Sequence, residues 1–200
     1  MADQLPITQS PLNKARKDKF QLVLTLPNVM KLIKSENKRE DAYLSLNSLQ
    51  FSVYSINIPD MEVSPIQMHY AGQNHNVTSF DRPPYAPVAV NFAVDNEFKN
   101  YWVIWKWLQL LNDPRSSTYG RPEIFKEVGG YPKLDPQILN DYTTTIMAYA
   151  LDEYNNKKAE FTFTNCFATR LGNYSYNYRD PEEIDCSFEF VFNQLDMHLV

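Results

Sequence analysis

Long apolar runs, glycine and positive charge are all scarce in this 200-residue sequence. Its uninterrupted apolar runs are only a few residues long, whereas a membrane-spanning helix needs about 20, and the polar N-terminus lacks an apolar signal-peptide core. We therefore expect a soluble protein that is not secreted through a signal peptide. Five glycines leave little material for a phosphate-binding loop. A net charge of −5 argues against binding of nucleic acid through many contacts between basic side chains and phosphates.

Cysteine is equally rare, and the two that occur, Cys166 and Cys186, lie where phenylalanines alternate with polar residues. If Phe163 faces the core, a regular strand places Cys166 on the opposite face, whereas Cys186 is in register with the core-facing phenylalanines that follow it. Cross-strand disulfide partners must share a face, so a bond between them would require a kink or bulge after Asn165. No Cys-x-x-Cys spacing supports a zinc or redox role.

Alternation of apolar and polar residues, which is typical of half-buried strands, recurs along the chain. The alternating sets are Phe20, Leu22, Leu24 and Leu26; Tyr54, Ile56 and Ile58; Val88, Val90, Phe92 and Val94; and Phe188, Phe190 and Phe192. Residues 142–151 and 159–165 flank a turn that contains Asn155 and Asn156, and so predict a hairpin. A long polar hairpin is predicted around Gly72. These patterns indicate about seven or eight strands.

One segment, residues 95–114, has convincing helical periodicity. Asp95 or Asn96 can cap its first turn, and Asp113 with Pro114 closes it. Aromatic and aliphatic residues recur at helical spacing and predict a face that packs on a sheet. The expected face consists of Phe98, Tyr101, Trp102, Trp105 and Leu108.

The combined pattern predicts a mainly β protein of the α+β class, an antiparallel sandwich or barrel with one amphipathic helix on its flank. We expect an N-terminal arm at residues 1–18 and one domain at residues 19–200. Within the domain, residues 28–48 are a charged excursion between strands. Residues 114–138 form a long connection rich in proline and glycine, and connections of this kind often contact partners.

Motifs for catalysis or metal binding are not evident. The histidines stand in no zinc-binding frame, and His69 and His75, which could approach each other across the hairpin, have no obvious third ligand. Nucleophile-elbow, P-loop and dinucleotide motifs do not occur. Carboxylates such as those at 181–185 could form a glycosidase pair, although acidic runs beside proline are usually solvated turns. We therefore expect no enzymatic activity, no cofactor and no metal.

Two stretches carry a resemblance to a known family. Residues 88–108, "VAVNFAVDNEFKNYWVIWKWL", contain a strand that leads through a polar turn into a helix with an aromatic seam, and residues 159–197 contain two alternating strands around a corner at Phe167, Ala168 and Thr169. With "INIPDMEVSPIQMHYAG", they resemble the tail tube proteins of contractile-tailed bacteriophages. The resemblance covers roughly residues 19–26 and 49–197.

The resemblance implies hexameric rings in which sheets of neighbouring subunits join into one inner barrel, stacked into a tube that carries DNA. It implies a ring-stacking hairpin with Met68, His69, Tyr70, Gly72, Gln73 and Asn74. The helix would lie on the outer wall, near a sheath, and Glu160 and Glu189 are candidates to face the lumen. Implied partners are further copies of the chain and the tail sheath, baseplate and tail-terminator proteins, in a virion tail assembled in the host cytoplasm.

Three alternatives remain open. The chain could form a single ring at the tube initiator, baseplate or tail terminus, or it could build the tube of a contractile injection or secretion system. From a different class, a glycan-binding or hydrolytic β-sandwich would use Trp102, Trp105 and Trp107 as a stacking platform. The helical spacing of these residues favours a packed seam over such a platform.

Overall fold

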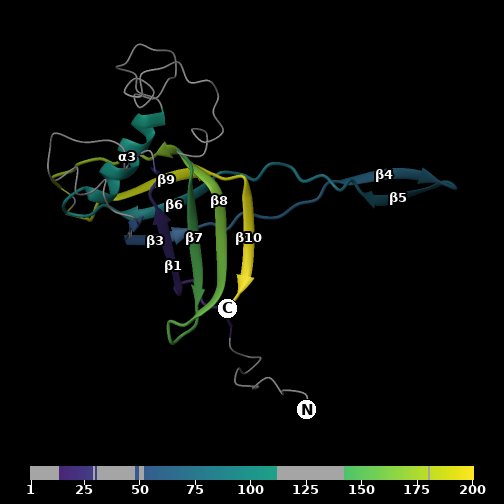
Figure 1. Cartoon of the computed structure of the whole chain (residues 1–200), viewed down its shortest axis with the longest axis horizontal. Helices are drawn as coiled ribbons and strands as arrows, with labels where there is room; N and C mark the ends of the chain where they lie inside the picture. The colour runs from purple at the N-terminus through teal and green to yellow at the C-terminus, as the bar shows by residue number, and fades with distance from the viewer. Residues whose placement is uncertain (1–13, 29, 31–47, 50–51, 112–141, 180) are drawn as a thin grey trace, which may run out of the picture.

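The structure is a computed structural model that describes residues 14–28, 30, 48–49, 52–111, 142–179 and 181–200. In these ranges an antiparallel sheet has the order β2-β1-β7-β8-β9-β6-β3, with β10 also paired to β8. Its strands are β1 (Phe20–Thr25), β2 (Ser48–Leu49), β3 (Ser52–Ile56), β6 (Val88–Ala93), β7 (Thr144–Leu151), β8 (Lys157–Leu171), β9 (Asp185–Val191) and β10 (Gln194–Leu199). Strands β4 (Pro65–Tyr70) and β5 (Gln73–Thr78) form a separate hairpin that stands away from the body (Figure 1). The predicted mainly β, antiparallel architecture is confirmed.

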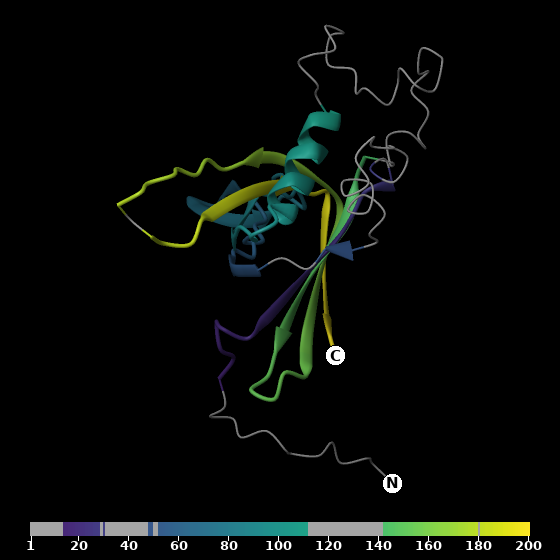
Figure 2. The ribbon, with the colours of Figure 1, turned by 90° about the vertical axis from the view of Figure 1, so that its left-hand side faces the viewer.

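Strand β8 bends and so belongs to two layers. Its first part pairs with β7 and β10, and its last part, from Phe167, pairs with β9. At the bend the β7–β8 register shifts, and Asn165 has a left-handed φ of 55°. A bulge of this kind turns a strand out of its plane. We call β1, β2, β7, β10 and the first part of β8 layer A, and β3, β6, β9 and the last part of β8 layer B; the two cross in Figure 2.

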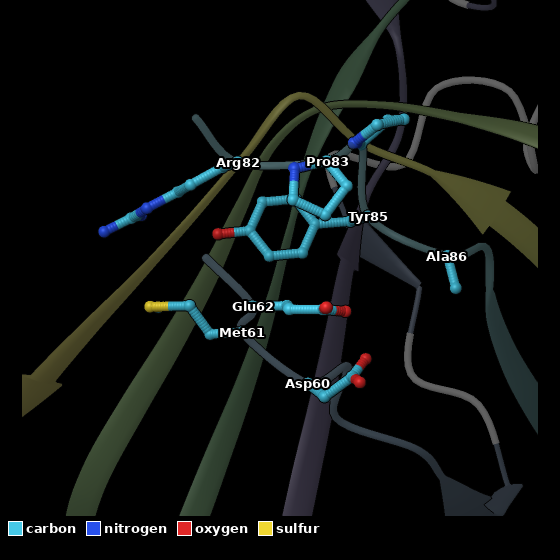
Figure 3. Close-up of a pocket in the computed structure, with 8 residues that line it drawn as sticks. Asp60, Met61, Glu62, Arg82, Pro83, Tyr85 and Ala86 are labelled. Atoms are coloured by element: carbon cyan, nitrogen blue, oxygen red, sulfur yellow. The ribbon is translucent and has the colours of Figure 1, made fainter. Parts of the chain in front are cut away.

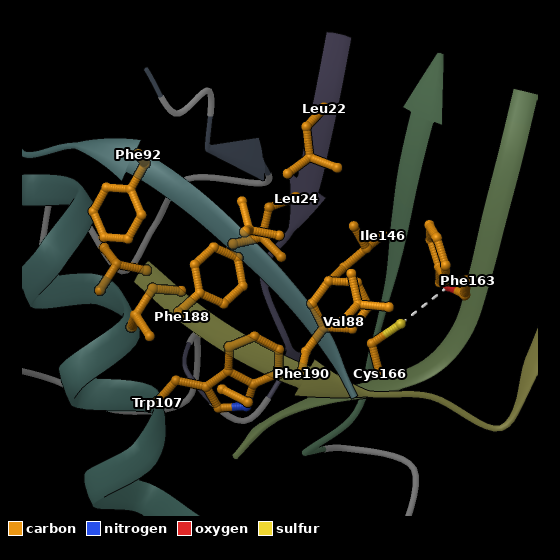
Figure 4. Close-up of a cluster of buried hydrophobic side chains, with 14 of the residues drawn as sticks. Leu22, Leu24, Val88, Phe92, Trp107, Ile146, Phe163, Cys166, Phe188 and Phe190 are labelled. Atoms are coloured by element: carbon orange, nitrogen blue, oxygen red, sulfur yellow. Dashed lines mark hydrogen bonds between the residues drawn. The ribbon is translucent and has the colours of Figure 1, made fainter. Parts of the chain in front are cut away.

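The hydrophobic core lies between the two layers and α3 (Lys99–Leu111). Inward residues alternate with outward ones along β1, β6, β7 and β9. The ring of Phe163 in layer A packs edge-on against that of Phe190 in layer B, with centroids 5.5 Å apart (Figure 4). The inward sets predicted for residues 22–26, 88–94 and 188–192 are confirmed, whereas Phe20 is only half-buried and lies outside the core cluster.

The buried seam of α3 differs from the predicted one. Val103, Ile104 and Trp107 are completely buried, whereas Trp105 is 41% exposed, so its inclusion in the packing face was wrong. Of the other expected residues, Tyr101, Trp102 and Leu108 pack against the edge of the core. Phe98 lies just before α3 and outside the core cluster, with its ring centroid 6.2 Å from that of Tyr174. The helix is apolar around most of its circumference, and its sequence alone therefore does not identify the seam that faces the sheet.

The start of α3 is fixed by two polar side chains. The carboxylate of Asp95 accepts a hydrogen bond from the backbone N–H of Lys99 at 2.7 Å, which confirms the predicted cap. Asn100, which is buried, donates to the carbonyl of Ala93 at 2.9 Å and accepts from the N–H of Asp95 at 3.2 Å. These bonds join the end of β6 to the first turn of the helix.

Two predicted strands differ in detail. In β3 the register on β6 shifts between Val53 and Ser55, so Val53 packs on the core and Tyr54 is exposed, contrary to the expected alternation. Of the other two predicted inward residues, Ile56 packs on the core, whereas Ile58 lies beyond the strand and is exposed. The predicted last strand divides into β9 and β10, which run in the same direction along the two parts of β8. Because β8 bends, its partner bends with it at Asn193, whose N–H donates to the carbonyl of Thr164 at 3.1 Å.

Several expectations fall wholly or largely outside the described residues. They are the connection at 114–138, the excursion at 28–48 apart from residues 28, 30 and 48, and most of the arm at 1–18. The division into an arm and one domain therefore stays a prediction. In the ranges that the structure describes, no helix is long and apolar enough to span a bilayer.

Candidate functional site

The β4–β5 hairpin has one apolar and one polar face. Its turn, Ala71 and Gly72, has positive φ at both residues (51° and 79°), as tight hairpin turns require. The register pairs Ile66 with Val77 and Met68 with His75, which places these side chains and that of Tyr70 on one face. All residues of both strands are exposed, including Tyr70 at 75%. The apolar face is therefore uncovered in the single chain.

The same register separates the predicted hairpin residues. Met68 and Tyr70 lie on the apolar face, whereas His69 pairs with Asn74 on the polar face, and Gln73 pairs with Tyr70 beside the turn. His69 and His75 thus point to opposite faces of the hairpin and do not share a metal site. Among the described residues there is no group of three or more His, Cys, Asp or Glu that could hold a metal ion.

The stem of the hairpin consists of two extended segments that meet at a cavity of about 220 Å³ (Figure 3). Its lining combines the carboxylates of Asp60 and Glu62 with Arg82, Pro83 and Tyr85. The ring of Tyr85 packs on Phe192 with centroids 4.9 Å apart, which ties the base of the stem to the core. Proline restricts the backbone on both sides of the stem, so the hairpin is held out on a stiffened support.

The face of layer A that points away from the core is mainly polar, although Val23 and Met147 lie in the same row as Thr162 and Asp196. Cross-strand rows there align Gln21 with Tyr149, Glu160 and His198, and Thr162 with Asp196. Strand pairing therefore puts Glu160 on a surface with a second carboxylate and several uncharged polar groups. Two cations of β8 lie at the margin of this face: Lys158 pairs with Asp152 at 3.6 Å, and the Lys157 Nζ lies over the Tyr149 ring, 3.5 Å from its centroid.

Glu189, the other predicted lumen residue, lies elsewhere. It projects from layer B, opposite Arg170 in the adjacent strand, and the Arg170 Nη1 to Glu189 Oε1 distance is 3.1 Å. Glu160 and Glu189 therefore do not share a face of one sheet. Sequence alternation correctly directed both side chains away from the core, but it did not reveal that β8 and β9 divide between two layers.

Both ends of layer A carry backbone that is open to further pairing within the described part of the chain. At one end β10 is hydrogen-bonded to β8 alone, and at the other β2 covers only Leu24 and Thr25 of β1. Unpaired strand edges of this length are templates for association with another chain.

The two cysteines are free and buried. The bulge at Asn165 turns Cys166 inward, so its predicted outward orientation was wrong, and its Sγ donates to the carbonyl of Phe163 at 3.2 Å (Figure 4). The β8–β9 register pairs Phe167 with Val191, which is five residues from Cys186. At about 3.3 Å per residue, the cysteines are too far apart along the sheet for a disulfide.

We expect Cys166 to resist alkylation in the folded protein at pH 8. Burial raises the pKa of this thiol from 9.0 to about 12, so the reactive thiolate is scarce. Because the unfolded chain releases this proton first, the group also makes folding less favourable as the pH rises from about 9 to about 12. Iodoacetamide labelling read by mass spectrometry checks this, with urea-unfolded protein as the reactive control; rapid labelling of native Cys166 contradicts it.

The three tryptophans of α3 do not form a flat platform for a sugar. The indole N–H of Trp107 donates to the carbonyl of Tyr142 at 3.1 Å inside the core, and Trp102 packs at the core margin. Trp105 alone of the three is exposed. A stacking platform needs adjacent exposed rings, so this geometry does not favour the glycan-binding alternative.

Comparison with known proteins identifies relatives of the chain. The model of a family described as phage tail tube protein matches residues 15–197. A search of curated protein sequences gives no significant match. Among solved structures, a chain of the anti-feeding prophage baseplate has a TM-score of 0.58 at 13% identity, covering 92% of this chain and 95% of its own length.

Two further solved structures have the same fold. A chain of the anti-feeding prophage tube-terminating cap has a TM-score of 0.55 at 11% identity, over 98% of this chain and 100% of the other. A chain of the sheath–tube complex of the extracellular contractile injection system PVC, in its extended state, has a TM-score of 0.52 at 10% identity, over 94% and 93%. At these identities the likeness concerns the fold alone.

Proposed function

The chain belongs to the phage tail tube protein family, and from this premise we propose that it is a structural subunit of a tail tube, assembled from stacked hexameric rings around a channel for DNA. The observation that carries the proposal is layer A, a sheet with a mainly polar outward face and, among the residues that the structure describes, an open edge at each end. In a ring, the β10 edge of one subunit pairs with the β1 edge of the next. Such head-to-tail pairing closes into a ring and covers both of these edges.

The outward face of layer A then becomes the wall of the channel. Its carboxylates, Glu160 and Asp196, repel phosphate, and its Thr and Gln side chains offer only weak neutral contacts. The cations Lys157 and Lys158 lie at its margin, where Lys158 is paired with Asp152. A wall that bound phosphate through many cations would hold DNA in place. This composition supports passage of DNA without specific binding, and it selects Glu160 over Glu189 as a lumen residue.

The hairpin and the helix serve the other contacts of the tube. The β4–β5 hairpin, which stands clear of the subunit body, contacts a neighbouring ring (Figure 1). The α3 surface around Trp105 lies on the outer wall, where a sheath would pack. The chain acts without enzymatic activity or a cofactor, as part of a virion tail assembled in the host cytoplasm, with baseplate and terminator proteins at the tube ends.

A second candidate function is a ring used once, at one end of the tube. Solved structures of the same fold come from a baseplate and a tube-terminating cap as well as from a sheath–tube complex. The fold therefore suits both a repeating subunit and a terminal ring, and also the tube of a contractile injection system.

Purified protein, alone or with its baseplate partners, is expected to form rings or tubes in negative-stain electron microscopy. A repeating subunit gives tubes of variable length, whereas a terminal ring stops at one or two layers. Light scattering gives the mass of the same particles in solution. A monomer under all these conditions would refute the tube function.

A further inference from the structure

The core face of layer A is incompletely covered at one end. Three cross-strand rows lie along this face, and they begin at Leu24, Leu22 and Phe20 of β1. In the first row, Leu24, Ile146 and Phe163 are completely buried. At the β10 end of the other two rows, Met197 is 57% exposed and Leu199 is 82% exposed. These side chains point to the same side of the sheet as the core. Among the described residues, burial thus decreases along the sheet and leaves part of this apolar face uncovered.

The same two rows border a groove of about 500 Å³ that lies away from β10, over β1, β7 and the first part of β8, with the end of β3 and Ile58 on its other side; we call it the layer A groove. The small side chains of Ala148 and Ala150 form its floor and leave space above the sheet. Its apolar walls are formed by Phe20, Ile56, Ile58 and Phe161. The rim is basic, with Arg16, Lys17 and Lys19. Asp18 pairs with Arg16 at 2.8 Å, which leaves Lys17 and Lys19 as the main cations of the rim.

The shape and chemistry of the groove specify its occupant. An apolar floor takes apolar side chains, and a cationic rim favours carboxylates beside them. The β4–β5 hairpin has Ile66, Met68 and Tyr70 on an uncovered apolar face, followed at its stem by two carboxylates, Asp60 and Glu62, against one cation, Arg82. A two-stranded hairpin is marginally stable alone, so its apolar face gains most from a groove that covers it.

The hairpin does not fill the groove of its own chain. Figure 1 shows it on the far side of two long extended segments, directed away from layer A. Those segments carry proline on both arms, at 59, 65, 83, 84 and 87, and so resist folding back. The occupant is therefore the hairpin of another copy.

We propose that the layer A groove is the receptor for the β4–β5 hairpin of a second copy of this chain, which inserts Met68 and Tyr70 between Phe20, Ile58 and Phe161. The inference rests on the proposed tube function and names the surface that the stacking hairpin meets. The contact is heterologous, because hairpin and groove are different surfaces, and it can repeat without limit along an axis. Each subunit thus donates one hairpin and receives another.

Site-specific cross-linking of mixed copies tests this proposal. Met68→Cys protein and Ile58→Cys protein are co-assembled in equal amounts and treated with a short bismaleimide, while native Cys166 and Cys186 stay buried. We expect a covalent dimer that requires both variants. Gln67→Cys, on the polar face of the same strand, is the matched control and should give at least about tenfold less dimer, because its side chain points away from the groove.

The possible outcomes separate this inference from the function on which it rests. Assembled particles in which Met68→Cys couples to Thr162→Cys, on the opposite face of layer A, and not to Ile58→Cys would overturn the groove while leaving the tube intact. Equal coupling of the Gln67→Cys control would overturn it as well. If microscopy shows no assembled particle, the tube function fails and this inference fails with it.

Discussion

Replacing Trp107 by alanine is expected to lower the free energy of unfolding by about 3–5 kcal/mol. The indole is completely buried between α3 and the sheets, and its N–H satisfies the carbonyl of Tyr142 at 3.1 Å. Truncation removes a large apolar volume and leaves that carbonyl without its partner. Domains are stable by only about 5–15 kcal/mol. A loss of about 4 kcal/mol lowers the Tm of a domain of this size by roughly 8–16 °C.

Two further variants test whether the burial and the hydrogen bond of Trp107 account for this loss of stability. Trp105→Ala removes the same atoms from a side chain that is largely outside the core, and we expect it to cost at most about 1 kcal/mol. Trp107→Phe keeps an aromatic ring but removes the hydrogen bond, with an expected cost of about 1–2 kcal/mol. Urea unfolding followed by circular dichroism measures all three. Equal losses for Trp105→Ala and Trp107→Ala would contradict the assigned seam of α3.

The tryptophans also show which parts of the fold could be predicted from the amino-acid sequence. Period-two alternation identified the inward residues of β1, β6 and β9, because each strand has one buried face. Turn chemistry located the β7–β8 hairpin, where Asn155 has a φ of 64°. In α3, by contrast, apolar side chains occupy neighbouring seams, and only packing against the sheets separates Trp107 from Trp105.

Bulges account for most of the remaining differences. A single extra residue at Asn165 turns the side chain of Cys166 from the outer face of β8 to the core. A shift in the β3–β6 register after Val53 leaves Tyr54 exposed. Alternation assumes an unbroken period of two, so every bulge inverts the prediction beyond it. The asparagine that adopts the left-handed conformation is a weak signal for such a bulge, and it becomes informative only once the pairing of β8 with β7 is known.

The candidate surfaces were predictable to different degrees. The hairpin could be located because Gly72 and its polar flanks mark a turn locally. The layer A groove could not be located from the sequence, because its residues come from β1, β3, β7 and β8, which are far apart along the chain. The sequence likewise directs Glu160 and Glu189 away from the core but does not assign them to different layers, since that depends on where β8 bends.

The double substitution Met68→Asp and Tyr70→Asp is expected to abolish the stacking of rings into tubes while leaving the fold, and single rings closed by the β10 and β1 edges, intact. Both side chains are exposed in the single chain, so the free energy of unfolding should change by no more than about 0.5 kcal/mol. In an assembly each would be buried, and burial of such a side chain contributes about 1.5–3 kcal/mol. A buried unpaired carboxylate adds a desolvation cost. Every subunit of a ring loses this contact at once, so the effect is multiplied around the ring.

Gln67→Asp with His69→Asp is the matched control, because it adds the same two charges to the polar face of the same strand. Its assembly should stay within a few-fold of the wild type, since these side chains point away from the apolar contact. Sedimentation and negative-stain microscopy measure assembly, and urea unfolding confirms the fold of each variant. If both double variants block assembly equally, charge on the hairpin and not its apolar face is responsible. If neither does, the hairpin is not an assembly surface, and the exposed edges of layer A must then account for association alone.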